Sequence, residues 1–201
     1  MTERHEQLSH ELGGWLDGDG EKTMGGLLDL FGERAFAVLF VLLLGVPALP
    51  LPTGGATHVF ELIAILVALQ LIVGRDEIWL PQRWRTIELA GGKRERFLTA
   101  LMKLIRRLER LSKPRLRFLF FRRLSNIVFG LLVVALTVAA FVAPPFTGLD
   151  TLPALGVVLL SLGVLLRDFL IVVLALVVGA AGVTLEIVLG TAAIKGIWQI
   201  F

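Results

Sequence analysis

No cysteine occurs among the 201 residues of the sequence. This absence excludes disulfide bonds, cysteine-ligated zinc, iron–sulfur clusters and thiol nucleophiles. Histidine is also scarce, with three residues, and the sequence contains neither a His-Glu-x-x-His motif nor a repeated Glu-x-x-His motif. We therefore expect no metal, no cofactor and no catalytic residue, and we do not expect an enzyme.

The sequence does not predict a secretory signal either. The N-terminal stretch MTERHEQLSHELGGWLDGDGEK is acidic, and it lacks a basic start, an early apolar core and an Ala-x-Ala cleavage site. Because acidic residues disfavour docking on anionic lipid, we expect this stretch to be a soluble cap rather than a helix on the membrane surface.

Charge of each sign is concentrated in a different part of the chain. Residues 1–34 carry three basic and eight acidic side chains, whereas residues 75–123 carry fifteen Lys or Arg and five Asp or Glu. Short basic segments beside membrane helices stay on the cytoplasmic side, so we expect residues 75–123 in the cytoplasm. The segment has no RNA-binding, zinc-finger or helix-turn-helix pattern, which argues against nucleic acid as a partner.

Hydrophobic residues make up 56% of the chain and the mean hydropathy is +0.81, values typical of an integral membrane protein. Apolar runs occupy residues 35–46, 59–73, 124–143, 152–166 and 169–194. At about 1.5 Å per residue, the third and the fifth run can cross a hydrocarbon core of about 30 Å, whereas the others are too short to cross as straight helices. We expect an all-α integral membrane protein with short, Pro/Gly-broken or re-entrant helices.

Two parts of the chain resemble each other. LPLPTG at residues 49–54 matches APPFTG at 143–148, and LQLIVGRD at 69–76 matches SLGVLLRD at 161–168. Each part contains an apolar helix, a proline-rich turn, a second apolar helix and an Arg-Asp pair, which predicts two duplicated helical hairpins. The residues expected to form the turns are Pro47, Pro50, Pro52, Gly54, Pro144, Pro145 and Gly148.

The repeat divides the chain into consecutive units. We expect an acidic amphipathic N-terminal cap at residues 1–30, a first membrane hairpin at 31–84, a basic amphipathic linker at 85–122, a second hairpin at 123–168 and a C-terminal membrane helix at 169–201. The repeats are parallel if both hairpins cross the bilayer, and inverted if the first element of a unit is re-entrant. Shallow hairpins inserted from the cytoplasmic side are a third arrangement.

Ionisable residues within or beside the apolar runs are candidates for a polar site at membrane depth. These candidates are Arg75, Asp76, Arg167, Asp168 and Glu186. In the competing interpretation, each Arg lies at the negative end of a helix dipole, each Asp caps the following helix, and Glu186 lies near the membrane interface. His58 and Glu61 share one helix face, but the further ligands of a metal site are missing.

Two surfaces are expected to contact lipid or another chain. Residues 93–111 form a basic amphipathic helix, which is typical of a segment lying on an anionic leaflet. Its expected lipid-surface contacts are Arg94, Lys103, Arg106, Arg107 and Arg110. In the last apolar run, Gly179, Gly182 and Gly190 provide a surface of small residues, which predicts a homodimer.

Several of these motifs resemble a known family. They are FGERAF at residues 31–36, ALPLPTG at 48–54, ALQLIVGRDEIWLPQRW at 68–84 and LPALGVVLLSLGVLLRD at 152–168. Together they resemble the ExoD family of bacterial membrane proteins, over nearly the whole chain from residue 23 onward. The resemblance implies a role in exopolysaccharide production in the cell inner membrane, and it brings no catalytic residue or cofactor with it.

Two hypotheses for the function stay open. A transport-like protein predicts that Arg75, Arg167, Asp168 and the proline turns converge on a polar cavity. A non-transporting scaffold or regulator of a polysaccharide synthase predicts that the basic cytoplasmic segment matters most. The expected partners are membrane lipids, a second copy of the chain and polysaccharide-synthesis proteins.

Overall fold

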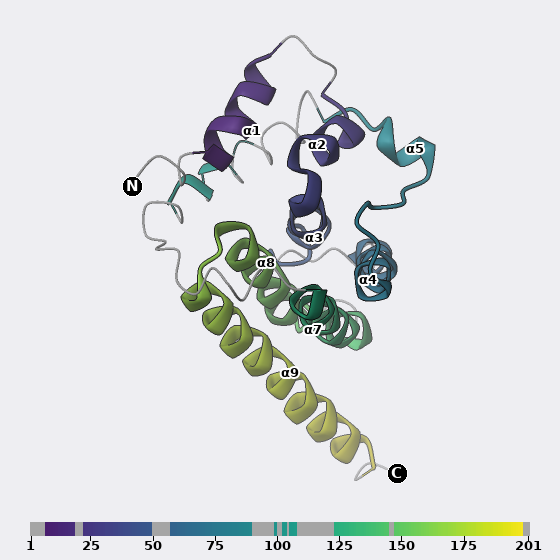
Figure 1. Cartoon of the computed structure of the whole chain (residues 1–201). Coiled ribbons are helices and arrows are strands. Elements are labelled where there is room, and N and C mark those ends of the chain that lie inside the picture. The colour runs from purple at the N-terminus through teal and green to yellow at the C-terminus, as the bar shows by residue number, and fades with distance from the viewer. Residues whose placement is uncertain are drawn as a thin grey trace.

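The computed structural model describes residues 7–18, 22–49, 57–89, 99, 102–103, 105–107, 123–144 and 147–198. The described residues form helices joined by loops, with one isolated bridge between Thr23 and Glu88, which confirms the all-α class. The elements in Figure 1 are α1 (Gln7–Asp17), α2 (Met24–Phe31), η1 (Gly32–Arg34), α3 (Ala35–Leu44), α4 (Thr57–Val73), α5 (Gln82–Arg85), α7 (Arg123–Val142), α8 (Thr151–Leu166) and α9 (Phe169–Trp198).

The five apolar runs of the sequence are the helices α3, α4, α7, α8 and α9. Helices α7 and α9, with 20 and 30 residues, are long and apolar enough to cross a membrane. Most of the apolar residues in these two helices are not buried inside the chain, unlike those of a core helix in a soluble protein. Helices α3, α4 and α8 are shorter, as their sequences predict.

Helix α3 lies at the centre of the molecule. Nine of its ten residues are buried, and Phe40 and Leu44 are completely covered. Helix α8 packs beside α3 and is also mostly buried, whereas α4, α7 and α9 surround this pair. In Figure 1, α3, α4 and α7 are viewed close to end-on, and α9 runs obliquely past them. A ten-residue helix rises only about 15 Å, so α3 depends on its neighbours for cover.

Close contacts at glycines join the helices in antiparallel pairs. A Cβ on Gly130 of α7 would lie 2.7 Å from the Ile72 side chain and 3.2 Å from the carbonyl oxygen of Ala68, both in α4. A Cβ on Gly156 of α8 would lie 2.8 Å from the Cα of Gly179 in α9. Only glycine allows these backbones to approach so closely, a type of contact that pairs of membrane helices also use.

The small-residue surface of α9 is occupied within the chain. Gly179 lies against Gly156, and Gly182 lies against the first turn of α8, where a Cβ would be 2.7 Å from Leu152. Among the three glycines expected at a homodimer interface, only Gly190 has no described neighbour within 4 Å of such a Cβ. The homodimer stays a prediction, because Gly179 and Gly182 serve the α8–α9 contact.

The N-terminal elements pack on the remainder of the chain. Asp29 of α2 accepts two hydrogen bonds from the Arg85 guanidinium of α5, at 2.7 and 3.0 Å. Leu12 of α1 is buried in the core, and the described part of the basic segment lies beside α1, with Ile105 buried. Apolar side chains of both amphipathic helices are therefore covered by protein.

The proline-rich turns are described in part. After α3, residues 45–48 form hydrogen-bonded turns and Pro47 is buried. After α7, Pro144 and Gly148 are exposed, and Gly148 has a φ of +69° that suits glycine. Pro50, Pro52, Gly54 and Pro145 lie outside the described residues, so the match between the two turns stays a prediction.

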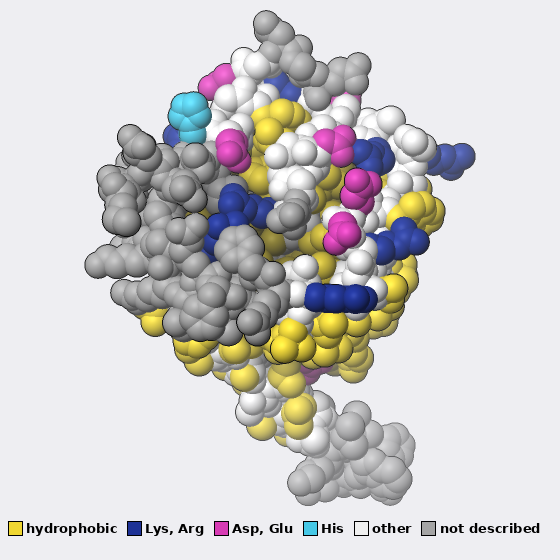
Figure 2. All heavy atoms as spheres, viewed as in Figure 1, with side chains coloured by type: hydrophobic (Ala, Val, Ile, Leu, Met, Phe, Trp, Pro, Cys, Tyr) yellow, Lys and Arg dark blue, Asp and Glu magenta, His cyan; other side chains and the backbone are white. Residues whose placement is uncertain are grey.

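Large apolar side chains are exposed on the outer helices. Figure 2 shows hydrophobic side chains gathered over the lower half of the molecule, while most charged side chains in this view lie over the half that contains α1, α2 and α5. The exposed apolar residues include Val59, Leu62, Leu66 and Val73 of α4, Leu124, Leu131 and Val142 of α7, and Val177, Ile187 and Val188 of α9. A surface this apolar is typical of contact with lipid or another protein.

Candidate functional site

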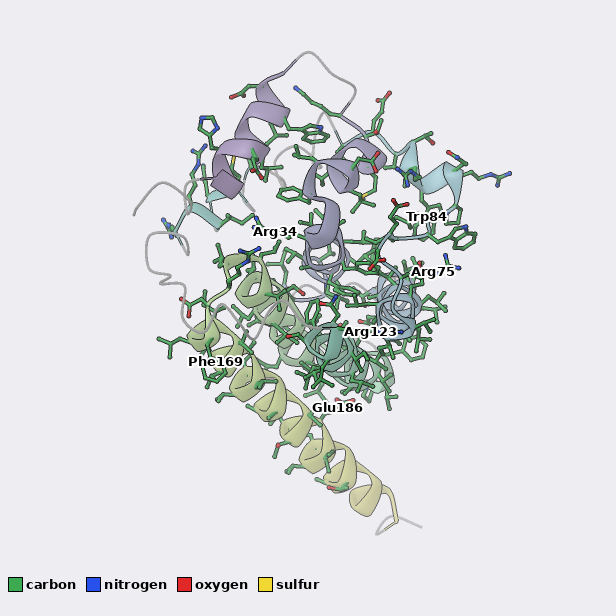
Figure 3. All side chains as sticks on the ribbon, in the orientation of Figure 1. Arg34, Arg75, Trp84, Arg123, Phe169 and Glu186 are labelled. Carbon is green, nitrogen blue, oxygen red and sulfur yellow. The ribbon has the colours of Figure 1, made fainter. Side chains whose placement is uncertain are left out.

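The two Arg-Asp pairs lie in unlike surroundings. Helix α4 ends at Val73, and the following Gly74 has a φ of +90°. Both Arg75, labelled in Figure 3, and Asp76 are exposed. Helix α8 ends at Arg167, which itself adopts the left-handed conformation with a φ of 55°. Asp168, by contrast, is 3% exposed. The two Arg-Asp pairs therefore have the same residues but differ in backbone conformation and in the burial of the aspartate.

Asp168 caps the helix that follows it. Its Oδ1 accepts a hydrogen bond of 2.9 Å from the backbone N–H of Leu170, in the first turn of α9. This contact satisfies one of the N–H groups that a helix start leaves open. The capping interpretation therefore accounts for the burial of Asp168.

Glu186 lies far from the Arg-Asp pairs. It follows Asp168 by 18 residues along α9, which is a continuous helix, so about 27 Å separates the two positions. Because α8 and α9 run antiparallel, Glu186 instead reaches the level of the residues that begin α8. The five predicted polar residues do not form one cluster.

A different polar group lies where α4 begins. Glu61 is 0% exposed, and its Oε2 lies 2.8 Å from Nδ1 of His58, one turn earlier. Its other oxygen, Oε1, is buried without a hydrogen-bond partner among the described residues. The His58 side chain is 29% exposed, and its ring packs on Phe141 of α7 with a centroid distance of 5.2 Å.

Asp150 links this pair with a carboxyl group of α9. Asp150, just before α8, is close enough for its charge to act on Glu61 of α4 and, separately, on Glu186 of α9. Both Asp150 and Glu186 are half-buried. We call His58, Glu61, Asp150 and Glu186 the acidic site. His58 and Glu61 lie at the opposite end of α4 from Arg75, and Glu186 lies 18 residues after Asp168.

The phase of α4 explains why Glu61 points inward. The buried residues of this helix follow one another at three- or four-residue spacing along one face, and Val67 beside Ala68 widens that face: Thr57, Glu61, Ala64, Val67, Ala68 and Leu71. This spacing defines the face that packs on the rest of the bundle. Glu61 therefore occupies a core position that an apolar residue would otherwise fill. Burying its carboxyl there costs folding free energy, and buried ionisable residues of this kind are candidates for a functional role.

A buried hydroxyl lies at the same depth as Glu61. Thr137 and Phe141 are one turn apart on the same face of α7, and Phe141 contacts His58. Because α4 and α7 run antiparallel, Thr137 lies at the level of Glu61, one turn deeper than His58. Thr137 is 0% exposed, and its Oγ1, like the Oε1 of Glu61, has no hydrogen-bond partner among the described residues.

The arrangement does not provide a metal centre of the usual kind. In the described ranges, no group of three or more His, Asp or Glu side chains is close enough to hold a metal ion. The acidic site instead combines one fully buried carboxyl, a histidine that reaches the surface, and the carboxyl of Asp150, which acts on Glu61 and on Glu186. Such a set is suited to binding and releasing a proton.

Comparison with known proteins decides the family. The family model described as "Exopolysaccharide synthesis, ExoD" matches residues 8–188. The chain belongs to the ExoD family. The matched range includes all four residues of the acidic site as well as both Arg-Asp pairs, and the earlier resemblance is confirmed.

Two relatives support membership of the ExoD family. The chain is 28% identical to an uncharacterised protein of a Synechocystis species over 198 residues, which cover 97% of this chain and 89% of the relative. It is 34% identical to the protein ExoD of Rhizobium meliloti over 151 residues, which cover 75% of this chain and 62% of that relative. No solved structure matches the ExoD-family chain.

The residues predicted to contact lipid in this ExoD-family chain are partly described. Lys103, Arg106 and Arg107 are exposed, and the Arg106 guanidinium donates to the sulfur of Met102 at 3.6 Å. Arg94 and Arg110 lie outside the described residues. Contact of this segment with lipid stays a prediction.

Sequence reasoning found half of the acidic site in the ExoD-family chain. The spacing of His58 and Glu61 places them on one face, but nothing in the sequence connects them with Asp150, 89 residues after Glu61. Glu186 was a candidate for a different reason, its position inside an apolar run. One sequence signal could have indicated that Glu61 is buried: Glu61 falls in register with the residues of α4 that face the protein interior.

Proposed function

We propose that the protein is an integral component of the bacterial inner membrane that takes part in exopolysaccharide synthesis in a transport-like manner, with the acidic site as its functional centre. It performs no chemical catalysis in this proposal. Membership of the ExoD family supports the link with exopolysaccharide synthesis. The name of the relative from Rhizobium meliloti supports the same link, although the chain spans only 62% of that relative.

The distribution of side chains supports a membrane setting. Helices α4, α7 and α9 expose apolar side chains along their length, and α7 rises about 30 Å, the thickness of a hydrocarbon core. Arg75 and Arg123 lie at one end of the α4–α7 pair, and the acidic site lies at the other. The positive-inside rule then puts residues 75–123 in the cytoplasm and the acidic site toward the opposite face.

The burial of Glu61 is the observation that carries the transport-like function. An ionisable side chain in an apolar bundle costs free energy, and in membrane proteins such residues mark ion and proton pathways. A pure scaffold gains nothing from a carboxyl at this position, because an apolar residue there would pack without an unpaired oxygen. The packed apolar centre around Phe40 and Leu44 favours movement of a small ion over passage of a sugar polymer through one chain.

The pairing of the helices supports the duplicated hairpins. Helix α3 packs on α4, and α7 packs on α8, as expected within each hairpin. Between the hairpins, α4 packs on α7 and α3 packs on α8, so each second helix meets the first helix of the other unit. This reciprocal pattern is what an internal two-fold relation requires, and transport proteins commonly place their sites between such repeats.

Genetic complementation tests the proposal. In a bacterium deleted for its own copy, the wild-type gene should restore exopolysaccharide output, whereas Glu61→Gln should restore less than about a tenth of it. Asp76→Asn is the matched control, because it neutralises an exposed carboxylate and should restore full output. Membrane levels of each variant are measured by immunoblot. Full restoration by Glu61→Gln at normal protein level would contradict a functional acidic site.

A scaffold for a polysaccharide synthase is the second candidate. The exposure of Lys103, Arg106 and Arg107 beside α1 favours it, because these cations are available to an acidic partner. In this case a synthase should co-purify with the wild-type protein, and neutralising Arg106 and Arg107 together should abolish the association. Glu61→Gln should leave it intact. Co-purification that survives loss of both arginines would count against the scaffold.

A further inference from the structure

We propose that Glu61 binds a proton reversibly at Oε1, and that the proton enters through His58 from the non-cytoplasmic face. The inference rests on the proposed function only for the membrane setting and the orientation. The reaction is the simple association of one carboxylate and one proton, so no bond to carbon forms or breaks and no other reactant is needed.

The two oxygens of Glu61 have different surroundings, which assigns the proton to one of them. Oε2 faces Nδ1 of His58 at 2.8 Å, and in the ionised state of Glu61 that nitrogen donates its hydrogen to Oε2. Oε1 is buried and has no described partner. An ionised carboxylate accepts several hydrogen bonds, so burial of a bare oxygen favours the protonated form, in which Oε1 carries a hydrogen.

The nearest level of α7 does not provide a donor for Oε1. The Oγ1 of Thr137 is buried as well, and neither Oγ1 of Thr137 nor Oε1 of Glu61 has a hydrogen-bond partner among the described residues. The two atoms are therefore not bonded to each other, and Oε1 is left without a donor when Glu61 is ionised.

Apart from His58, the charge that acts on Glu61 is that of a carboxylate. Asp150, just before α8, acts on Glu61 and also on Glu186 of α9. Helix α3 contains no ionisable residue, and the single ionisable residue of α7, Arg123, lies at its other end. Residues 45–56 and 124–149 contain no ionisable side chain. These segments therefore bring no Lys or Arg to Glu61.

His58 connects the buried carboxyl with the outside. The His58 side chain is partly exposed, whereas the Glu61 side chain is buried. The imidazole ring of His58 packs on the ring of Phe141 in α7. An imidazole can take a proton from water on one nitrogen and release one from the other. The path begins at the end of α4 that lies opposite Arg75, so its opening faces away from the basic segment.

Infrared difference spectroscopy of the purified full-length protein in lipid tests this assignment. Acidification should produce a band of protonated carboxyl in the wild-type protein, and Glu61→Gln should remove it. Glu61→Asp, which keeps a carboxyl, should retain a band at a shifted frequency, so a missing band in Glu61→Gln is not mistaken for misfolding. Asp76→Asn should leave the band unchanged.

A further variant separates proton binding from a structural role. Asp150→Asn should lower the pH at which half of the band has formed, because it removes a negative charge that favours the protonated form of Glu61. A structural role alone does not predict this change.

The contrary outcomes are equally specific. If the wild-type and Glu61→Gln spectra are identical from acidic to alkaline pH, Glu61 does not take up a proton. If sodium chloride, but not choline chloride, abolishes the band at constant pH, the site holds sodium instead of a proton. Either result overturns the inference, whereas failure of complementation by Glu61→Gln with an intact wild-type band would leave it standing.

Discussion

At the scale of single residues, the two Arg-Asp pairs show how position decides the role of a side chain. Asp76 follows a glycine-terminated helix into an exposed loop, where water solvates its carboxylate. Asp168 lies in the short connection between two helices: α8 has its C-cap at Arg167, and α9 begins at Phe169. The carboxylate of Asp168 is therefore buried in the corner between α8 and α9, where the backbone N–H of Leu170 donates a hydrogen bond to it.

The capping role of Asp168 leads to a stability prediction. Asp168→Ala removes the hydrogen bond to Leu170 N and should destabilise the protein by about 1 kcal/mol or more, because an N-cap carboxylate contributes about that much. Asp168→Asn should recover most of the loss, because Asn also accepts from a helix N-terminus. Thermal unfolding in detergent measures the difference. Asp76→Ala, in the exposed pair, should have little effect, and equal losses for the two alanine variants would contradict the capping role.

At the scale of the elements, the α8–α9 pair depends on the absence of side chains. Gly156 and Gly179 place the two backbones in contact, and Gly182 repeats the contact one turn further along α9. This approach brings Glu186 to the level of Asp150 and so completes the acidic site. The geometry of the site is thus set partly by glycines that carry no chemistry themselves.

A substitution at Gly179 tests this dependence. Gly179→Leu should push α9 away from α7, loosen its packing in the bundle and destabilise the protein by about 1–3 kcal/mol, the usual cost of overpacking, because a Cβ there would already lie 2.7 Å from Leu136 of α7. Gly190→Leu is the matched control on the same helix, since no described atom lies within 4 Å of its Cβ position. Thermal unfolding and exopolysaccharide output are both measured. Tolerance of Gly179→Leu would argue against the close contact.

The elements themselves were largely predictable, while their contacts were not. The apolar run at residues 59–73 became α4 (Thr57–Val73), and the run at 152–166 became α8 (Thr151–Leu166), because an uninterrupted apolar stretch has few ways to satisfy its backbone other than a helix. Small residues such as Gly179 indicate a close contact but not its partner. The partner proved to be α8 of the same chain.

The candidate site shows the same division. Glu61 and His58 are linked by local helical geometry, which the sequence contains. Asp150 and Glu186 join them only through the packing of α8 and α9 on the remainder of the bundle. The two Arg-Asp motifs do not indicate one polar site, because a shared dipeptide does not determine the backbone conformation or the burial of the residues around it.

At the scale of the whole molecule, the chain has two chemically distinct ends separated by apolar outer faces. Arg75 and Arg123 mark one end of the α4–α7 pair, and the acidic site marks the other. Between them, the exposed surfaces of α4, α7 and α9 are apolar. A bilayer fits this distribution, since it covers the apolar faces and leaves both ends in water.

The central claim is that the two ends lie on opposite sides of the membrane, and cysteine labelling tests it most directly. The chain has no cysteine, so Arg75→Cys and Thr147→Cys, both at exposed positions, each introduce a single thiol. Thr147→Cys also replaces a hydroxyl that donates to Pro144 O and accepts from Leu149 N in the exposed turn. A membrane-impermeant maleimide should label Thr147→Cys in cells with a permeabilised outer membrane, and Arg75→Cys only in inside-out vesicles. Labelling of both variants from the cytoplasmic side would contradict the account, because it would mean that the hairpins enter the bilayer without crossing it.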